Sequence, residues 1–205
     1  MSSAVEEPVR PPWFVIVRHG ETEWSASGRH TGSTDIDLTE HGRARAAALP
    51  DFLRQWVDPA ESVAFASPRR RAIATAGLAM PEVTPTVTDL LAELDYGDYE
   101  GRTTAEITAK RPGWELFTDG TPGGESIKAA GARADQFIEL AIEQCSARPV
   151  VAFSHGHFSR ILTARLLGLD ATAGALLYND TASVAVVMLR RGIYVLDGWN
   201  MRPSL

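Results

Sequence analysis

Trp13-Phe14-Val15-Ile16-Val17 is an uninterrupted apolar run, and it leads directly into Arg18-His19-Gly20-Glu21-Thr22. A short run of this kind is typical of a buried strand with other elements packed on both of its faces. Two later apolar runs are also followed directly by basic residues. Val63-Ala64-Phe65-Ala66 precedes Ser67-Pro68-Arg69-Arg70-Arg71, and Val150-Val151-Ala152-Phe153 precedes Ser154-His155-Gly156-His157. Each of these three apolar runs therefore ends in a cluster of basic residues.

The rest of the chain predicts further strands that alternate with helices. Strands are expected at 13–17, 62–66, about 83–88, 149–153 and in a hairpin of 184–189 with 193–196. Helices are expected at 39 to about 57, 69–79, 103–110, 125 to about 147 and 158–167, with Pro50 kinking or splitting the first. This alternation indicates an α/β sandwich around a largely parallel, buried sheet of five or six strands.

Length and composition indicate one globular domain. The chain has 205 residues, of which 44% are hydrophobic and 22% are charged. At ~150 residues per domain this length favours one domain with a small cap. We expect a flexible N-terminal arm at 1–12, a single domain at 13–205, and a lid insertion at 96–124, which is rich in Gly, Thr, Pro and aromatic residues.

Charge and cysteine usage exclude several classes of protein. The net charge of −6 argues against general binding to nucleic acid. The single cysteine, Cys145, cannot form an internal disulfide, which fits a reducing compartment. No apolar run approaches the ~18 residues that a membrane helix needs, and residues 1–12 lack the pattern of a signal peptide. We therefore expect a cytoplasmic protein that binds neither nucleic acid nor membranes.

The three basic clusters predict one anion-binding site. The carboxyl ends of parallel strands lie at the same edge of an open α/β sheet, and ligands bind there. A single cluster is as often a solvated turn as a site, whereas three together indicate a shared function. Arginine forks suit phosphoryl oxygens and disfavour a nearby metal cation, so no metal site is predicted. The nucleophile must then come from the protein, and His19 or His155 is the candidate.

Several motifs, in this order along the chain, resemble the histidine phosphatase superfamily. They are Arg18-His19-Gly20-Glu21-Thr22, Thr31-Gly32, Leu38-Thr39-Glu40-His41-Gly42, Ser67-Pro68-Arg69-Arg70-Arg71-Ala72 with Thr75-Ala76, Glu93 before Tyr96-Gly97, and Ser154-His155-Gly156. The resemblance covers about residues 13–190 and is to the branch that contains the cofactor-dependent phosphoglycerate mutases. It implies a three-layer α/β/α sandwich and phosphoryl transfer without a metal or a cofactor.

The resemblance also implies a role for each catalytic residue. His19 would attack phosphorus and become phosphohistidine, while Arg18 and Arg71 hold the phosphoryl oxygens. His155 would donate hydrogen bonds to the same oxygens. Glu93 would protonate the leaving oxygen and then deprotonate the attacking water. Arg71 is chosen by the family spacing Ser-x-x-x-Arg-Ala, and its two neighbouring arginines are expected to be solvated.

The expected phosphate or substrate contacts are Ser25, Thr31, Gly32, Gly156 and His157. Ser25 departs from the family, which usually has asparagine here, but a serine hydroxyl also donates to phosphate, with shorter reach. Gly156 lets the backbone approach a ligand closely. His157 and Arg160 either meet a second phosphate or a sugar hydroxyl, or face solvent at the start of a helix.

The motifs favour a phosphatase over two alternatives, a phosphoglycerate mutase and a non-catalytic phosphate-binding or signalling module. Residues 100–117 contain no adjacent arginine pair, with which the mutases hold a substrate carboxylate. Gly123-Gly124-Glu125-Ser126 is similar to the phosphatase members. We expect hydrolysis of small phosphorylated metabolites such as sugar phosphates, in the manner of acid phosphatases and sedoheptulose-bisphosphatase-type enzymes. The apolar hairpin near 184–196 would suit a homo-oligomer.

Overall fold

The computed structural model describes residues 13–204, which contain a six-stranded sheet in the order β3-β2-β4-β1-β5-β6. The strands are β1 (Phe14–Arg18), β2 (Val63–Ala66), β3 (Thr86–Val87), β4 (Val150–Ser154), β5 (Val184–Arg190) and β6 (Ile193–Met201). The first four in chain order run parallel, and β5 and β6 add antiparallel pairs at one side. The predicted, mainly parallel sheet is therefore confirmed. The N-terminal arm expected at 1–12 lies outside the described residues.

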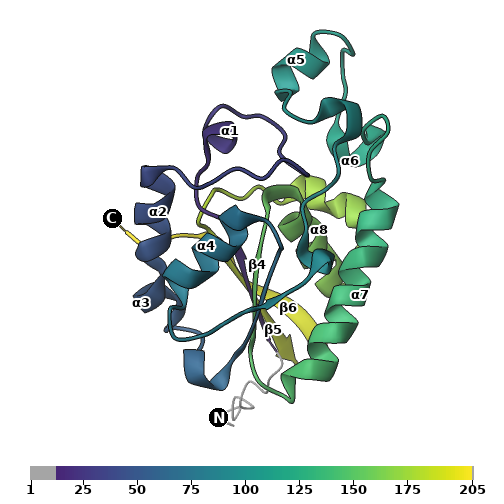
Figure 1. Ribbon diagram of the computed structural model, residues 1–205. Coiled ribbons are helices and arrows are strands. Elements are labelled where there is room, and N and C mark those ends of the chain that lie inside the picture. Colours follow the sequence, from purple (N-terminus) through teal and green to yellow (C-terminus); the bar gives the residue numbers. More distant parts are fainter. Residues whose placement is uncertain (1–12, 205) are drawn as a thin grey trace, which may run out of the picture.

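Helices cover both faces of this sheet and give the three layers that the resemblance implied (Figure 1). The helices are α1 (Glu23–Ala26), α2 (Glu40–Ala47), α3 (Leu49–Leu53), α4 (Arg70–Ala79), α5 (Thr104–Thr108), α6 (Leu116–Asp119), α7 (Ile127–Cys145) and α8 (Gly156–Leu166). Alternate side chains of the buried strands point to opposite faces. Val15, Val17 and Phe153 therefore pack with α3 and α4, whereas Phe14 and Ile16 pack with α7 and α8.

The helix boundaries follow from local chemistry. The helix expected from 39 to about 57 is split, as Pro50 predicted: α2 ends at Ala47, and Pro50 lies in the first turn of α3, where its missing N–H costs nothing. α7 begins after Ser126, whose hydroxyl accepts from the Ala129 amide at 3.1 Å. The strand expected at about 83–88 is only the two-residue β3. The four-residue helices α1 and α6 were not predicted, because so short a segment carries no periodicity.

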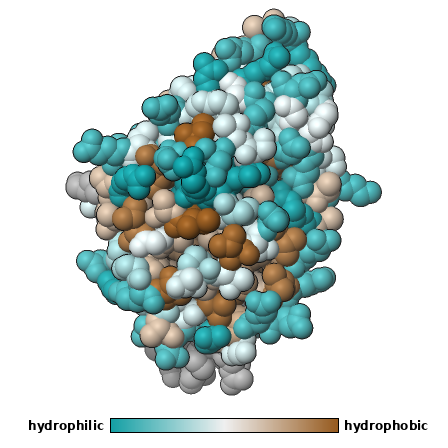
Figure 2. All heavy atoms as spheres, viewed as in Figure 1, coloured by the Kyte–Doolittle hydropathy of each residue, from teal (hydrophilic) through white to brown (hydrophobic). Residues whose placement is uncertain are grey.

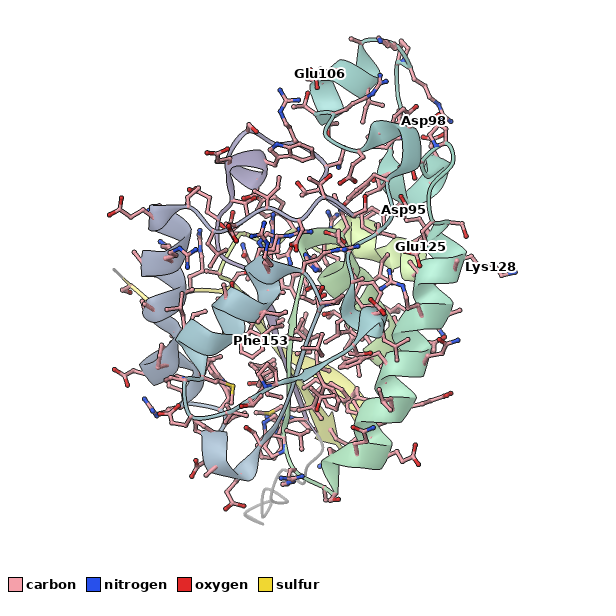
Figure 3. The ribbon with its side chains drawn as sticks, viewed as in Figure 1. Asp95, Asp98, Glu106, Glu125, Lys128 and Phe153 are labelled. Atoms are coloured by element: carbon pink, nitrogen blue, oxygen red, sulfur yellow. The ribbon has the colours of Figure 1, made fainter. Side chains whose placement is uncertain are left out.

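The segment 96–124 contains α5 and α6 and extends beyond the carboxyl end of the sheet (Figure 1). The two ends of this segment are hydrogen-bonded to each other, just before α7 begins. The Asp95 carbonyl accepts from the Glu125 amide at 2.9 Å, and the Asp98 amide donates to the Pro122 carbonyl at 2.9 Å. Asp95, Asp98 and Glu125 lie on the same side of the molecule in Figure 3. That this segment acts as a lid stays a prediction.

Polar and apolar residues are unevenly distributed over the surface. Figure 2 shows hydrophobic residues gathered across the middle of one face, with mainly hydrophilic residues above them over the 96–124 segment. The exposed large hydrophobic residues include Leu176, Tyr178 and Ile193, the last of which begins β6. Within residues 13–204 no helix combines the length and the hydropathy that crossing a membrane requires.

Candidate active site

The basic clusters that follow β1, β2 and β4 meet at one edge of the sheet. Arg18 at the end of β1 is in register with Ser154 at the end of β4, and the His19 amide donates to the Ser154 carbonyl at 2.9 Å. The rings of His19 and His155 lie edge to face, with their centroids 5.1 Å apart. The strand order therefore brings together two histidines that are 136 positions apart in the chain.

A cavity of about 130 Å³ opens at this edge. Seven of the predicted site residues line it: Arg18, His19, Ser25, Thr31, Glu93, Gly156 and His157. Arg160, for which the sequence left two possibilities, also lines the cavity. Arg29, Tyr96, Tyr178 and Asn179 complete the lining, and none of these four was predicted as a site residue.

His19 is held in one tautomer. Its Nδ1 lies 2.7 Å from the Gly20 carbonyl oxygen, which can only accept, so the ring proton is on Nδ1 and the lone pair is on Nε2. Burial lowers the pKa of His19 well below its ordinary value, and the nearby charges of Arg71 and Arg18 lower it further. The ring is therefore neutral near pH 7, and its Nε2 is a free nucleophile.

Arg18 has an unused donor beside His19. Its Nη1 donates to the Asn179 carbonyl at 2.7 Å, whereas its Nε is buried and has no hydrogen-bond partner within residues 13–204. Burial lowers the pKa of Arg18, but a guanidinium stays charged at neutral pH. A buried charged donor without a partner is costly, and an anionic oxygen is the partner that would satisfy it.

Arg71 and His155 do not line the cavity, and both are fully buried. Arg71 donates to the carbonyls of Thr34 and Thr31 at 2.9 Å, and its Nε donates to His155 Nδ1 at 3.2 Å. The other ring nitrogen of His155 lies 2.7 Å from the Ser67 hydroxyl. Both ring nitrogens thus have protein partners in this arrangement, so direct donation from His155 to a phosphoryl oxygen requires exchange of the Ser67 hydrogen bond.

Glu93 lies at the N-terminus of α8 and is buried. Its carboxylate accepts from the amides of His157 at 3.1 Å and Phe158 at 2.8 Å. These are orphan donors of the first helical turn, so the helix itself orients the carboxylate. Glu93 lines the same cavity as His19, where a carboxyl group can exchange a proton with a reacting oxygen.

Of the other residues predicted to contact phosphate or substrate, Ser25 and Thr31 line the cavity, whereas Gly32 does not. Ser25 lines the cavity but also closes a capping box, its hydroxyl accepting from the Thr22 amide at 2.8 Å. The Thr31 hydroxyl donates to the Arg29 carbonyl at 3.0 Å. Gly32 is placed differently from the expectation: its amide donates to the Glu100 carboxylate at 2.9 Å, and a Cβ there would lie 2.2 Å from the Leu94 carbonyl oxygen. It is a close-packing glycine rather than part of the cavity lining.

His157, the second histidine of the cavity lining, is half-buried and has several ring contacts. Its Nδ1 is hydrogen-bonded to the Tyr96 hydroxyl at 2.5 Å, and its ring packs on His30 and Phe117, each with centroids 5.7 Å away. Arg160 lies nearby, with its Nε donating to the Gly174 carbonyl at 2.8 Å. Of the four lining residues that were not predicted, only Tyr96 belongs to one of the family motifs, because it follows Glu93 by three residues.

Arginine and histidine, not carboxylates, dominate this site. Among residues 13–204 there is no group of three His, Cys, Asp or Glu side chains that could hold a metal ion. The lining offers positive donors, one carboxylate and a neutral nucleophile, which is the equipment for transfer of a phosphoryl group.

Comparisons with known proteins agree with this geometry. An acid phosphatase of Mycobacterium tuberculosis is 42% identical over 90% of this chain and 90% of that protein. A sedoheptulose 1,7-bisphosphatase of Saccharomyces cerevisiae is 32% identical over 79% of this chain and 70% of that protein. Phosphoglycerate mutases are also among the relatives.

Solved structures extend the likeness to the fold. The product of an open reading frame of Mycobacterium tuberculosis, 40% identical, superposes with a TM-score of 0.88 over 94% of this chain and 99% of that chain. The family model for the histidine phosphatase superfamily (branch 1) matches residues 14–202, a region that includes all three strand-end clusters and Glu93. The chain therefore belongs to the histidine phosphatase superfamily, branch 1.

Proposed function

We propose that this enzyme hydrolyses phosphomonoesters of small metabolites through a phosphohistidine at His19, without a metal ion. Membership of the family and the phosphatases among its relatives make it an enzyme acting on phosphate esters. The observation that supports the proposed chemistry most directly is the Nδ1 contact of His19 with the Gly20 carbonyl, which leaves Nε2 free. Arg18, whose Nε has no partner among residues 13–204, lines the same cavity.

The first half-reaction forms the phosphoenzyme. The Nε2 lone pair of His19 attacks phosphorus, and the bond between phosphorus and the ester oxygen breaks. The leaving oxygen takes a proton from the Glu93 carboxyl group, so that a neutral alcohol departs. Arg18 stabilises the charge on the phosphoryl oxygens, and the buried charge of Arg71 contributes from behind the histidines.

The second half-reaction releases phosphate. Glu93, now ionised, accepts a proton from water while the water oxygen attacks phosphorus. The phosphorus–nitrogen bond breaks, His19 becomes neutral again, and inorganic phosphate leaves. Because Glu93 alternates between acid and base, its fixed position at the start of α8 serves both steps.

The rest of the cavity supports a small substrate with a second polar group. Arg29, Arg160 and His157 line the cavity together with the reacting residues, so donors remain for a part of the substrate other than the transferred phosphoryl group. A sugar phosphate has acceptor oxygens of this kind, and a relative bears the name of a sugar bisphosphatase. We propose phosphorylated sugars and similar metabolites as the substrate class.

We also propose that the enzyme is cytoplasmic, that two copies of the chain can associate, and that residues 96–124 form a lid. The buried, single Cys145 fits a cytoplasmic enzyme. The exposed Ile193 and Leu196 of the β5–β6 hairpin would suit contact between two copies of the chain. The segment 96–124 would act as the lid over the cavity, since Tyr96 at its start lines it.

Phosphate release tests the proposed function. Sugar mono- and bisphosphates, phosphoglycerates and an aryl phosphate are incubated with the enzyme in excess chelator. We expect release that survives the chelator and falls by at least ~10³-fold in His19→Ala, because the nucleophile is removed. His41→Ala is the matched control, since His41 is an exposed histidine on α2 and its loss should leave the rate unchanged.

Two outcomes would contradict the proposal. Isomerisation of a phosphoglycerate, stimulated by a bisphosphate primer and without net phosphate release, would show a mutase. Binding of phosphorylated ligands without turnover of any would show a binding module.

A further inference from the structure

Tyr96, which is buried, and His157, which is half-buried, form a hydrogen-bonded pair within the cavity lining. Tyr96 is 1% exposed, and its hydroxyl lies 2.5 Å from Nδ1 of His157. Within residues 13–204 the Tyr96 hydroxyl has no other hydrogen-bond partner. The mechanism proposed above uses neither side chain in its chemical steps.

The direction of this hydrogen bond follows from burial. Burial raises the pKa of the Tyr96 phenol well above its ordinary value, so the hydroxyl keeps its proton. A buried O–H needs an acceptor, and Nδ1 of His157 is the acceptor within reach. Tyr96 therefore donates and Nδ1 accepts, which requires Nδ1 to be unprotonated.

The proton of the His157 ring must then be on Nε2. Burial lowers the pKa of His157 well below its ordinary value, and the charge of Arg160 lowers it further, so the ring is neutral. Nε2 has no hydrogen bond to residues 13–204, and His157 lines the cavity. The ring is also restricted in orientation, because it packs on both His30 and Phe117.

We propose that Tyr96 is a positioning residue that holds His157 in the Nε2–H tautomer, so that His157 offers a neutral hydrogen-bond donor to the substrate. This inference deepens the proposed function and rests on it for the identity of the ligand. The donor would take an acceptor oxygen of the substrate, either a hydroxyl or a second phosphate of the phosphorylated metabolite. The donor is present in the neutral ring, so it does not require protonation of His157.

Nitrogen NMR tests the tautomer without any substrate. In the ¹⁵N-labelled wild type, we expect the His157 ring to show an unprotonated, hydrogen-bonded Nδ1 and a protonated Nε2, with His157→Asn identifying its signals. Tyr96→Phe keeps the ring that packs on His30 at 4.9 Å but removes the donor. In this variant the signals should become those of a ring exchanging between the two neutral tautomers. A protonated Nδ1 in the wild type would overturn the inference.

Kinetics test the consequence for the substrate. We expect Tyr96→Phe to raise KM by ~3- to 10-fold with little change in kcat, as for one lost hydrogen bond of uniform binding. In a His157→Ala background the same change should add less than about twofold, because the two residues act as one unit. Tyr99→Phe is the matched control: Tyr99 packs on Trp114 in the same segment, and its hydroxyl makes no hydrogen bond within the described chain.

Failure of the positioning role of Tyr96 and failure of the proposed function would give different results. An equal effect of Tyr96→Phe in both backgrounds would overturn the positioning role. Absence of turnover in the wild type would contradict the proposed function, while the NMR result would still decide the tautomer. Thermal unfolding of Tyr96→Phe within a few degrees of the wild type would exclude loss of folding as the cause of a raised KM.

Discussion

The missing side chain of Gly156 makes room for the guanidinium of Arg18. A Cβ at position 156 would lie 3.2 Å from Cζ and 3.3 Å from Nε of Arg18, which is closer than ordinary van der Waals contact. We predict that Gly156→Ala displaces Arg18 slightly and lowers kcat/KM by about 10-fold, because a misplaced donor stabilises the transition state less well. The fold should not become less stable, since alanine suits a helix better than glycine does. Steady-state kinetics and thermal unfolding of the same preparation check both parts.

Gly77→Ala is the control for the helix effect. Gly77 is exposed on α4, and a Cβ there would meet nothing within 4 Å. This variant should gain ~0.5–1 kcal/mol of stability and keep the wild-type rate. A Gly156→Ala enzyme with an unchanged kcat/KM would show that Arg18 does not depend on the space at this position.

The last strand of the sheet supports the active site through the loop that precedes β5. Asn200 of β6 accepts from the Asp180 amide at 2.8 Å and donates to its carboxylate at 3.2 Å, and the neighbouring Asn179 carbonyl accepts from Arg18. Asn200 has a φ of 53°, so glycine can replace it without backbone strain. We predict that Asn200→Gly loosens the loop and lowers kcat/KM by ~3- to 10-fold, as measured by steady-state kinetics.

A control on the same hairpin separates this effect from general destabilisation. Arg190 of β5 forms a largely solvated ion pair with Asp197, and such pairs contribute little to stability. Arg190→Ala should therefore leave kcat/KM unchanged. If Asn200→Gly also leaves it unchanged, the loop holds Arg18 without help from β6.

The elements that the sequence predicted best are those with a sharp boundary at each end. The runs that became β1 and β4 follow prolines and end at a polar cluster, so their limits were predicted within one residue. The clusters contain four of the residues that line the cavity, namely Arg18, His19, Gly156 and His157. Tyr178 and Asn179 could not be predicted, because they reach the cavity only through the antiparallel pairing of β5 with β1. Strand order is a property of packing between distant segments, and local patterns do not contain it.

The hydrogen bonds of His155 were also beyond prediction from the sequence. A motif shows that a histidine follows β4, but not that Arg71 and Ser67 engage both of its nitrogens. Likewise, the Thr31-Gly32 motif does not reveal that the Gly32 amide donates to Glu100, 68 positions away. Buried polar groups are satisfied by whichever partner the completed fold brings near, so these assignments require the fold.

Enclosing several neutral histidines makes the stability of the whole protein depend on pH. Burial lowers the pKa of His19, His30, His155 and His157 in the folded state. The unfolded chain, with ordinary histidine pKa values near ~6.5, then binds more protons than the folded chain below that pH. The stabilisation is therefore fully present above about pH 6.5 and is lost as the pH falls, by up to ~1.4 kcal/mol per pH unit for each histidine.

We predict that unfolding takes up more than about two protons at ~pH 5.5, where carboxylates are still mostly ionised and histidines dominate the difference. Calorimetric unfolding in two buffers of different ionisation enthalpy measures this number. His19→Asn should reduce the uptake by about one proton, because one buried neutral histidine is removed. Gly77→Ala, which removes no titratable group, should leave it unchanged. Unfolding without proton uptake would mean that the buried histidines are already charged in the folded state. His19 would then lack the free Nε2 lone pair that the proposed attack on phosphorus requires.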